Sequence, residues 1–212
     1  MFGHPAQLTL DTLPVTALFD AGQVYGGRAY RDCITSAHAL RVPIVNARRG
    51  IRWSSGDGVT LDILAPSLPL LADTGDDVNE NSIVAMLRYQ NFREFFMGDA
   101  GESSEARLLA SGVDLRANVL KVGHHGSRYA STPAFIAAVH PQTAIISVGR
   151  HNTFGHPAVS TLQTLSATST AIYRTDRCGS VSLSGLNEPS TTLSCPPLVI
   201  PSLSRDRLNL ER

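Results

Sequence analysis

The stretch Val119-Leu120-Lys121-Val122-Gly123-His124-His125-Gly126-Ser127 joins an apolar run to a pair of histidines that glycines enclose. The run from Ala117 to Val122 has the composition of a buried strand. Two adjacent histidines point to opposite sides of the chain, and a protein core has little use for both. Because α/β proteins build their sites at strand ends, we interpret this stretch as a strand that leads into a functional site.

Two further polar positions repeat this arrangement. Asp99 follows the apolar run Phe92 to Met97, and His156 lies beyond the run Ala144 to Val148. Imidazole nitrogens and a carboxylate oxygen on a rigid frame are typical ligands of a divalent cation. Each has a structural alternative, because a Gly-Asp pair after a strand is often a turn and a His before proline can cap a helix. The candidate metal ligands and catalytic residues are Asp99, His124, His125 and His156.

Glycines stand beside each candidate, at Gly98, Gly123, Gly126 and Gly155. The missing Cβ lets a ligand or a phosphate approach the backbone closely. Asn152 lies four residues before His156 in a polar loop, which suits orienting a catalytic group or a substrate oxygen. We therefore include Asn152 among the candidate catalytic and substrate-binding residues.

Strands and helices alternate along the rest of the chain. The short connection Gln90-Asn91 between two apolar runs predicts a hairpin, and Thr132-Pro133 has the chemistry of a helix start. A loop is expected at 67–80. Strands are predicted at 15–19, 42–47, 59–64, 83–89, 92–97, 117–122, 144–148, 171–173 and 180–183, and helices at 27–40, 103–111, 132–139 and 156–165.

The composition limits the classes of function. Of 212 residues, 42% are apolar and 17% are charged, which is typical of a globular protein. The 18 basic residues balance the 18 acidic ones, so a nucleic-acid substrate would have to be recognised by a local site. Three widely spaced cysteines indicate neither a disulfide framework nor a thiolate metal site. No apolar run approaches the roughly 20 residues that span a bilayer, so we expect a soluble chain.

Six motifs follow one another along the chain between about Val15 and Leu183. In order, they are Asn79-Glu80-Asn81-Ser82, Met97-Gly98-Asp99, the opening stretch Val119 to Ser127, Ile145-Ile146-Ser147-Val148-Gly149 with Asn152, Gly155-His156-Pro157, and Tyr173-Arg174-Thr175-Asp176. Together these motifs resemble the metallo-β-lactamase-like C-terminal domain of the ComEC family of competence DNA-uptake proteins.

The resemblance implies an αββα sandwich, with two mixed sheets face to face and helices outside. It implies a metal-dependent phosphodiesterase, a nuclease that acts in competence and uses Zn or Mn, with two ions in the complete family domain. DNA and a membrane channel, in the same or a neighbouring protein, are the implied partners. The implied location is bacterial, at the outer face of the cytoplasmic membrane, and we expect a monomer.

The resemblance also implies roles for single residues. Asp99 resembles a bridging carboxylate, and His124 or His125 a metal ligand or the proton donor to the leaving oxygen. His156 resembles a further ligand or a phosphate contact. The residues expected to hold substrate oxygens are Ser127 and Asn152.

One departure from the family concerns its His-x-Asp/His-x-Asp-His motif, which should precede Val15. Only Met1 to Pro14 precede that point, and His4 and Asp11 lack the motif's spacing. We therefore expect a sandwich that lacks its first βα units, with an impaired metal site and an exposed sheet edge. The expected division is an altered N-terminal remnant at 1–14, a partial domain at 15–184 and a disordered tail at 185–212.

Three alternatives to an impaired nuclease domain stay open at this point. The chain could be a non-catalytic docking or DNA-binding module of an uptake channel. It could be a hydrolase of another phosphoester with a single metal held by Asp99, His125 and His156. Finally, a start placed too late would leave the missing motif upstream.

Overall fold

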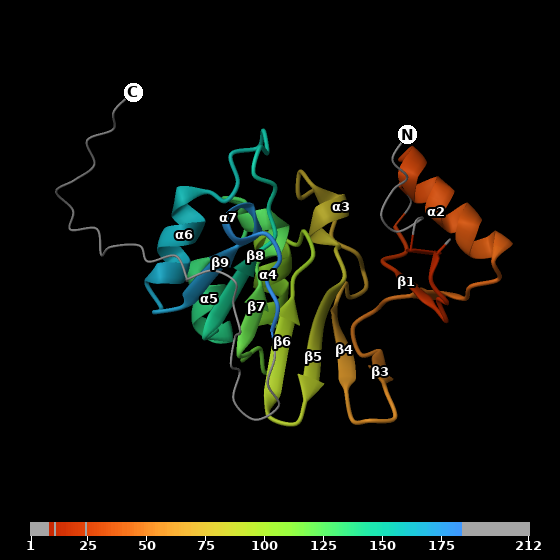
Figure 1. Cartoon of the computed structure of the whole chain (residues 1–212), viewed down its shortest axis with the longest axis horizontal. Helices are drawn as coiled ribbons and strands as arrows, with labels where there is room; N and C mark the ends of the chain where they lie inside the picture. The colour runs from red at the N-terminus through yellow and green to blue at the C-terminus, as the bar shows by residue number, and fades with distance from the viewer. Residues whose placement is uncertain (1–8, 11, 24, 184–212) are drawn as a thin grey trace.

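The computed structural model describes residues 9–10, 12–23 and 25–183, and its main feature is a seven-stranded sheet (Figure 1). The strands follow the order of the chain from one edge of the sheet to the other. They are β3 (Arg52–Ser54), β4 (Thr60–Ala65), β5 (Val84–Tyr89), β6 (Phe92–Phe96), β7 (Val119–Lys121), β8 (Thr143–Ile146) and β9 (Ala171–Arg174).

The direction of strand pairing in the sheet changes at β6. Strands β3 to β6 pair antiparallel, whereas β6 to β9 pair parallel. The parallel connections contain α4 (Glu102–Leu109), α5 (Pro133–Val139) and α6 (Val159–Ser166), and α7 (Thr175–Cys178) follows β9. Because the strands β6 to β9 are parallel, their carboxyl ends lie at one edge of the sheet, where α/β proteins place ligands.

One large core joins the sheet to these helices. Phe95 of β6 and Phe135 of α5 are fully buried, and their rings meet edge to face with centroids 5.7 Å apart. Helix α5 begins as the sequence predicts, because the Thr132 hydroxyl accepts the Phe135 N–H and Pro133 occupies the first turn. This core fixes the strand ends that surround the candidate site.

A smaller unit precedes the large sheet. It consists of β1 (Leu18–Asp20), α2 (Arg28–Ala39) and β2 (Ile44–Asn46), with β1 parallel to β2. Its own core buries few side chains, among them Cys33 and Ala37. Phe19 of β1 packs against the cluster that contains Ile63 of β4, which joins the unit to the large sheet.

The mixed α and β class is confirmed, and of the two expected sheets the second consists of only β1 and β2 in the described part of the chain. Several local predictions were wrong. The segment 180–183 forms no strand, and α6 begins at Val159 rather than at His156. Strand β3 was missed because its side chains are all exposed and show no apolar alternation, and the predicted loop at 67–80 contains the short helix α3 (Asp77–Glu80).

Two segments of the expected division fall wholly or mostly on residues that the structure does not describe. The predicted tail at 185–212 and most of the predicted remnant at 1–14 lie outside the described residues.

Cys178 is disulfide-bonded, which the wide spacing of the cysteines did not indicate. Within the described ranges, no helix has the length and apolar character needed to cross a membrane.

Candidate functional site

Asp99 lies at the end of β6, where two neighbours fix its backbone. The Ser82 hydroxyl accepts the Asp99 N–H at 3.1 Å. Gly98 has a left-handed φ of 57°, and a Cβ there would lie 3.0 Å from the Ser82 Cβ. A side chain at position 98 would therefore push the Asp99 backbone away from Ser82. This close approach explains the glycine before the aspartate and directs Asp99 to the carboxyl edge of the sheet.

The histidine pair occupies a tight turn directly after β7. His124 and His125 have φ values of 45° and 55°, in the left-handed region that few residues other than glycine adopt. The flanking glycines make this turn possible, since a Cβ on Gly123 would lie 2.8 Å from the Ala100 carbonyl oxygen. The His124 N–H donates to the Gly98 carbonyl at 3.0 Å, which ties the turn to the Asp99 loop.

His125 lies between β8 and Asp99. Its Nδ1 is 2.6 Å from the Ser147 carbonyl oxygen, and its Nε2 is 3.5 Å from the Asp99 Oδ1. A carbonyl oxygen only accepts hydrogen bonds, so Nδ1 must carry the proton in this contact. The atom that faces Asp99 is therefore Nε2, which has a free lone pair when His125 is neutral.

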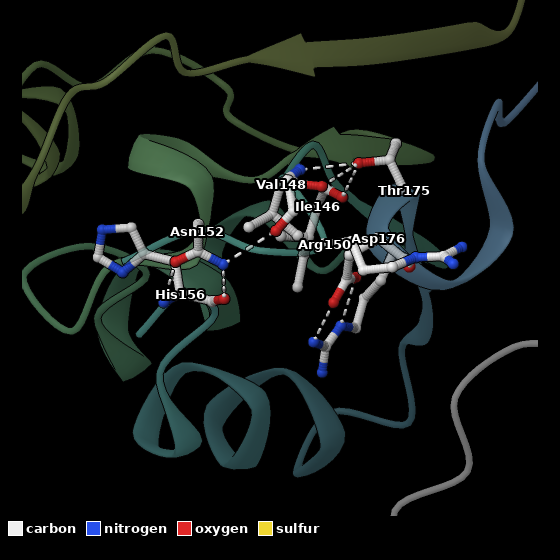
Figure 2. A network of polar contacts seen from close by, with 9 residues as sticks. Ile146, Val148, Arg150, Asn152, His156, Thr175 and Asp176 are labelled. Carbon is white, nitrogen blue, oxygen red and sulfur yellow. Dashed lines mark hydrogen bonds and ion pairs between the residues drawn. The ribbon is translucent and has the colours of Figure 1, made fainter. Parts of the chain in front are cut away.

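His156 completes the cluster from the loop before α6. Its ring meets that of His124 edge to face with centroids 5.8 Å apart. Figure 2 shows how Asn152 holds this loop, because its side-chain oxygen accepts the His156 N–H and its amide nitrogen donates to the His156 carbonyl. Burial and the neighbouring imidazoles lower the pKa of His156 below its ordinary value, and Arg128 adds to this effect.

The structure thus brings four of the predicted site residues together at one edge of the sheet. The other two, Ser127 and Asn152, make hydrogen bonds within the protein. Ser127 is only 2% exposed, and its hydroxyl accepts the Tyr129 N–H at 3.3 Å. Asn152 uses its amide within the loop. Substrate contacts by Ser127 and Asn152 stay predictions. The four residues brought together are Asp99, His124, His125 and His156.

The donor types suit Zn or Mn, but the described side chains do not form a metal site by themselves. Among the described residues, no group of three or more His, Cys, Asp or Glu side chains could hold a metal ion. Asp99 contacts His125, while His124 packs against His156. These contacts leave two pairs rather than one shared ligand set.

Two hollows lie on either side of this cluster, and each contains an aromatic side chain that sequence reasoning missed. Tyr129 lines a hollow of about 400 Å³ with Asp99 and His124. Phe154 lines another of about 450 Å³ with His125 and His156. The signal for both was available, because each is an aromatic residue in a polar loop within four residues of a candidate histidine.

Comparison with known proteins gives three relatives. The chain is 33% identical over 164 residues to the ComE operon protein 3 of Bacillus subtilis, which is 77% of this chain and 20% of that protein. It is 31% identical over 131 residues to the competence protein ComA of Neisseria gonorrhoeae, and 30% identical over 136 residues to Recombination protein 2 of Haemophilus influenzae. These matches cover 61% and 64% of this chain and 18% and 16% of the relatives.

The expected resemblance to competence proteins is confirmed, and the chain spans about a fifth of the length of these relatives. No protein-family model matches the chain. A solved structure described as a metal-dependent hydrolase from Parabacteroides distasonis aligns with 78% of each chain at 13% identity and a TM-score of 0.46. A variant of the CmlA beta-hydroxylase aligns with 66% of this chain and 34% of its own at 10% identity and a TM-score of 0.44.

Proposed function

We propose that this chain, a homologue of part of the ComE operon protein 3 and of the competence protein ComA, acts on the phosphodiester backbone of DNA during competence. The single observation behind this proposal is the meeting of Asp99, His125 and His156 at one edge of the sheet, from three separate strand ends. Their order along the chain and the strands that precede them follow the resemblance to a nuclease domain. The reaction class is hydrolysis of a phosphodiester by water.

The residues of the chain would contribute in distinct ways. The Ser147 carbonyl holds His125 in the tautomer that turns Nε2 toward Asp99. In the imidazolium form of His125, the Nε2 proton would lie between the ring and the Asp99 carboxylate and could pass to a leaving oxygen, which returns His125 to the neutral form with its proton on Nδ1. Asn152 and Ser82 are positioning residues, because their hydrogen bonds fix the backbone of the groups that would face the phosphodiester.

A divalent ion, Zn or Mn, would polarise the phosphodiester and activate water when bound. The described residues alone do not hold such an ion. We therefore propose that metal binding needs further ligands in addition to Asp99, His124, His125 and His156. In their absence we expect weak binding and impaired hydrolysis.

The test is metal content measured by elemental analysis after dialysis against trace Zn and Mn, followed by hydrolysis of a labelled DNA oligonucleotide with and without chelator. We expect Asp99→Ala to lose any bound ion and to lower the hydrolysis rate at least roughly 100-fold. Asp20→Ala is a matched control, because Asp20 begins the same Asp-Ala-Gly tripeptide at the end of β1. Equal rates in the wild type and Asp99→Ala would contradict the hydrolytic proposal.

A second candidate function is a non-catalytic module that docks to an uptake channel or binds DNA. The observation that favours it is the lack of a group of three metal-binding side chains within the described residues. This function predicts DNA binding that neither chelator nor the Asp99→Ala substitution weakens. Hydrolysis that depends on Asp99 would exclude it.

We further propose that the chain acts as a monomer beside a membrane channel, at the outer face of the bacterial cytoplasmic membrane. The disulfide at Cys178 fits that side, because disulfides persist in oxidising compartments. Light scattering of the purified chain measures its molar mass in solution, and the mass of a dimer would contradict the monomer. Labelling of the protein in intact cells with a reagent that does not cross the membrane tests the location, and absence of labelling would contradict it.

A further inference from the structure

The hollow that contains Phe154 differs in charge from the hollow on the other side of the histidine cluster. Its walls comprise His125, Ser147, Val148, Gly149, Asn152, Phe154, His156 and Thr175, with no carboxylate among them. The opposite hollow includes four acidic side chains, Asp76, Glu80, Asp99 and Glu102. Negative charge disfavours a phosphate, so a nucleic-acid strand at the cluster would extend toward the Phe154 hollow.

Hydrogen bonds hold the walls of this hollow in place before any ligand binds. The Thr175 hydroxyl accepts the Val148 N–H at 2.8 Å and lies 2.9 Å from the Val148 carbonyl oxygen (Figure 2). Asn152 donates to the carbonyls of Gly149 and His156. The walls come from His125 in the turn after β7, from the loop that joins β8 to α6, and from the start of α7. A site held in this way requires little ordering on binding.

Phe154 presents an aromatic ring to this hollow. The residue is 78% exposed, and its ring stacks on His156 with an interplanar angle of 16° and centroids 5.9 Å apart. The exposure leaves most of the ring surface to solvent while the imidazole fixes its orientation. Isolated exposed apolar residues are common, but this one stands in a hollow next to the proposed phosphodiester site.

We propose that the hollow binds a nucleobase next to the phosphodiester at the histidine cluster, and that Phe154 stacks on that base. The inference rests on the proposed function. Bases stack readily on exposed aromatic rings in proteins that bind single strands. A base inside a duplex already stacks on its neighbours and cannot reach the ring, so the preferred substrate is single-stranded DNA or an unpaired end.

The charges around Phe154 agree with a nucleic-acid strand. Arg128 is exposed and lies close enough to His156 to affect its ionisation. Arg150 is exposed at the loop after β8, where its Nε donates to the Asp176 carbonyl. A cation near an aromatic ring is a combination by which proteins hold single strands, and Arg128 supplies a cation near the His156 ring on which Phe154 stacks.

The test measures fluorescence anisotropy of a labelled thymidine oligonucleotide in excess chelator, so that binding is separated from hydrolysis. We expect Phe154→Ala to weaken binding roughly 5- to 100-fold and Phe154→Trp to retain it. Trp53→Ala is the control, because Trp53 is also an exposed aromatic residue but lies on the edge strand β3. The same oligonucleotide made of abasic sites should bind wild type and Phe154→Ala equally.

A spectroscopic signature follows from the single tryptophan of the chain, Trp53. In the double variant Trp53→Phe, Phe154→Trp, the only indole lies in the hollow, and stacking on a base should quench its fluorescence. Circular dichroism verifies that each variant folds. DNA binding that Phe154→Ala leaves unchanged would overturn this inference and spare the proposed function, whereas a wild type that neither binds DNA in chelator nor hydrolyses it with Zn or Mn would contradict both.

Discussion

The tripeptide Asp-Ala-Gly occurs at the end of two strands, with different results. After β1, the Asp20 carboxylate accepts the N–H of Gly22 at 2.6 Å and the hydroxyl of Tyr30 at 3.2 Å. After β6, the Asp99 carboxylate faces the imidazole of His125 at 3.5 Å. The first aspartate closes its own loop, whereas the second belongs to a candidate site.

The difference follows from the neighbours of each strand. β6 has β7 on one side, followed by β8, and the parallel ends of these strands place histidines and backbone carbonyls around Asp99. β1 pairs only with β2 in the described sheet, and the space at its end is filled by Arg48, which donates to the Ala21 carbonyl at 2.7 Å. The same tripeptide thus contributes to a site only where several strand ends meet.

The two regions also differ in packing, and the first prediction tests that difference. Phe135 is fully buried in the large core, whereas Cys33 is among the few residues buried in the core beside β1. We expect Phe135→Ala to lower the free energy of unfolding by about 3–5 kcal/mol, and Cys33→Ala by about 1 kcal/mol. Urea unfolding at equilibrium measures both, and equal losses would contradict the dominance of the large core.

The helices beside the large sheet also contain a buried carboxylate, and the described residues around β1 include none. Glu105 of α4 accepts the N–H groups of Ser131 and Thr132 at 2.5 and 2.8 Å. Burial raises the pKa of Glu105 to about 7. The folded state therefore holds the proton more tightly than the unfolded chain, and the stability from this group is complete below about pH 4.5 and is lost as the pH rises through about 7.

The corresponding prediction compares the free energy of unfolding at pH 5 and pH 8. The shift of the Glu105 pKa is worth on the order of 3 kcal/mol, so Glu105→Gln should reduce the pH-dependent loss by that amount. The control is Glu102→Gln, at an exposed position in the same helix, which should leave the loss nearly unchanged. A loss that persists in Glu105→Gln would show that other groups cause it.

The sequence predicted the elements better than the contacts between them. The connection Gln90-Asn91 and the pair Thr132-Pro133 located the hairpin β5–β6 and the start of α5, because turn and cap chemistry is local. Strand β3 was missed because an exposed edge strand shows no apolar pattern, and its pairing with β4 depends on more distant residues.

The candidate site was predictable as a set of residues but not as a geometry. The glycines around the histidine pair were expected to let a ligand approach the backbone, and this stays a prediction, because the atoms that lie close to Gly123 and Gly126 are those of Ala100 and Pro157. The contact of His125 with the Ser147 carbonyl depends on how β7 and β8 align, and the sequence does not specify that register. The separation of the cluster into two pairs likewise comes from the left-handed backbone at His124 and His125, which residue identity alone does not predict.

The smallest predicted effect addresses the two Asp-Ala-Gly tripeptides directly. Asp20→Ala removes the acceptor for Gly22 and Tyr30, so we expect a loss of about 1 kcal/mol in the free energy of unfolding. Asp99→Ala removes a carboxylate whose described contact is a 3.5 Å approach to a half-exposed imidazole, and we expect a change within about 0.5 kcal/mol. Urea unfolding at one pH measures the two variants side by side.

The order is reversed for function. Asp99→Ala should lose any bound metal and lower the rate of DNA hydrolysis, whereas Asp20→Ala should leave both unchanged. A stability loss at Asp99 as large as that at Asp20 would mean that both carboxylates serve their own loops. The meeting of strand ends at β6 to β8 would then be a packing arrangement rather than a site. A stable Asp99→Ala variant that has lost function would show that position in the sheet, rather than the local tripeptide, decides what an aspartate does.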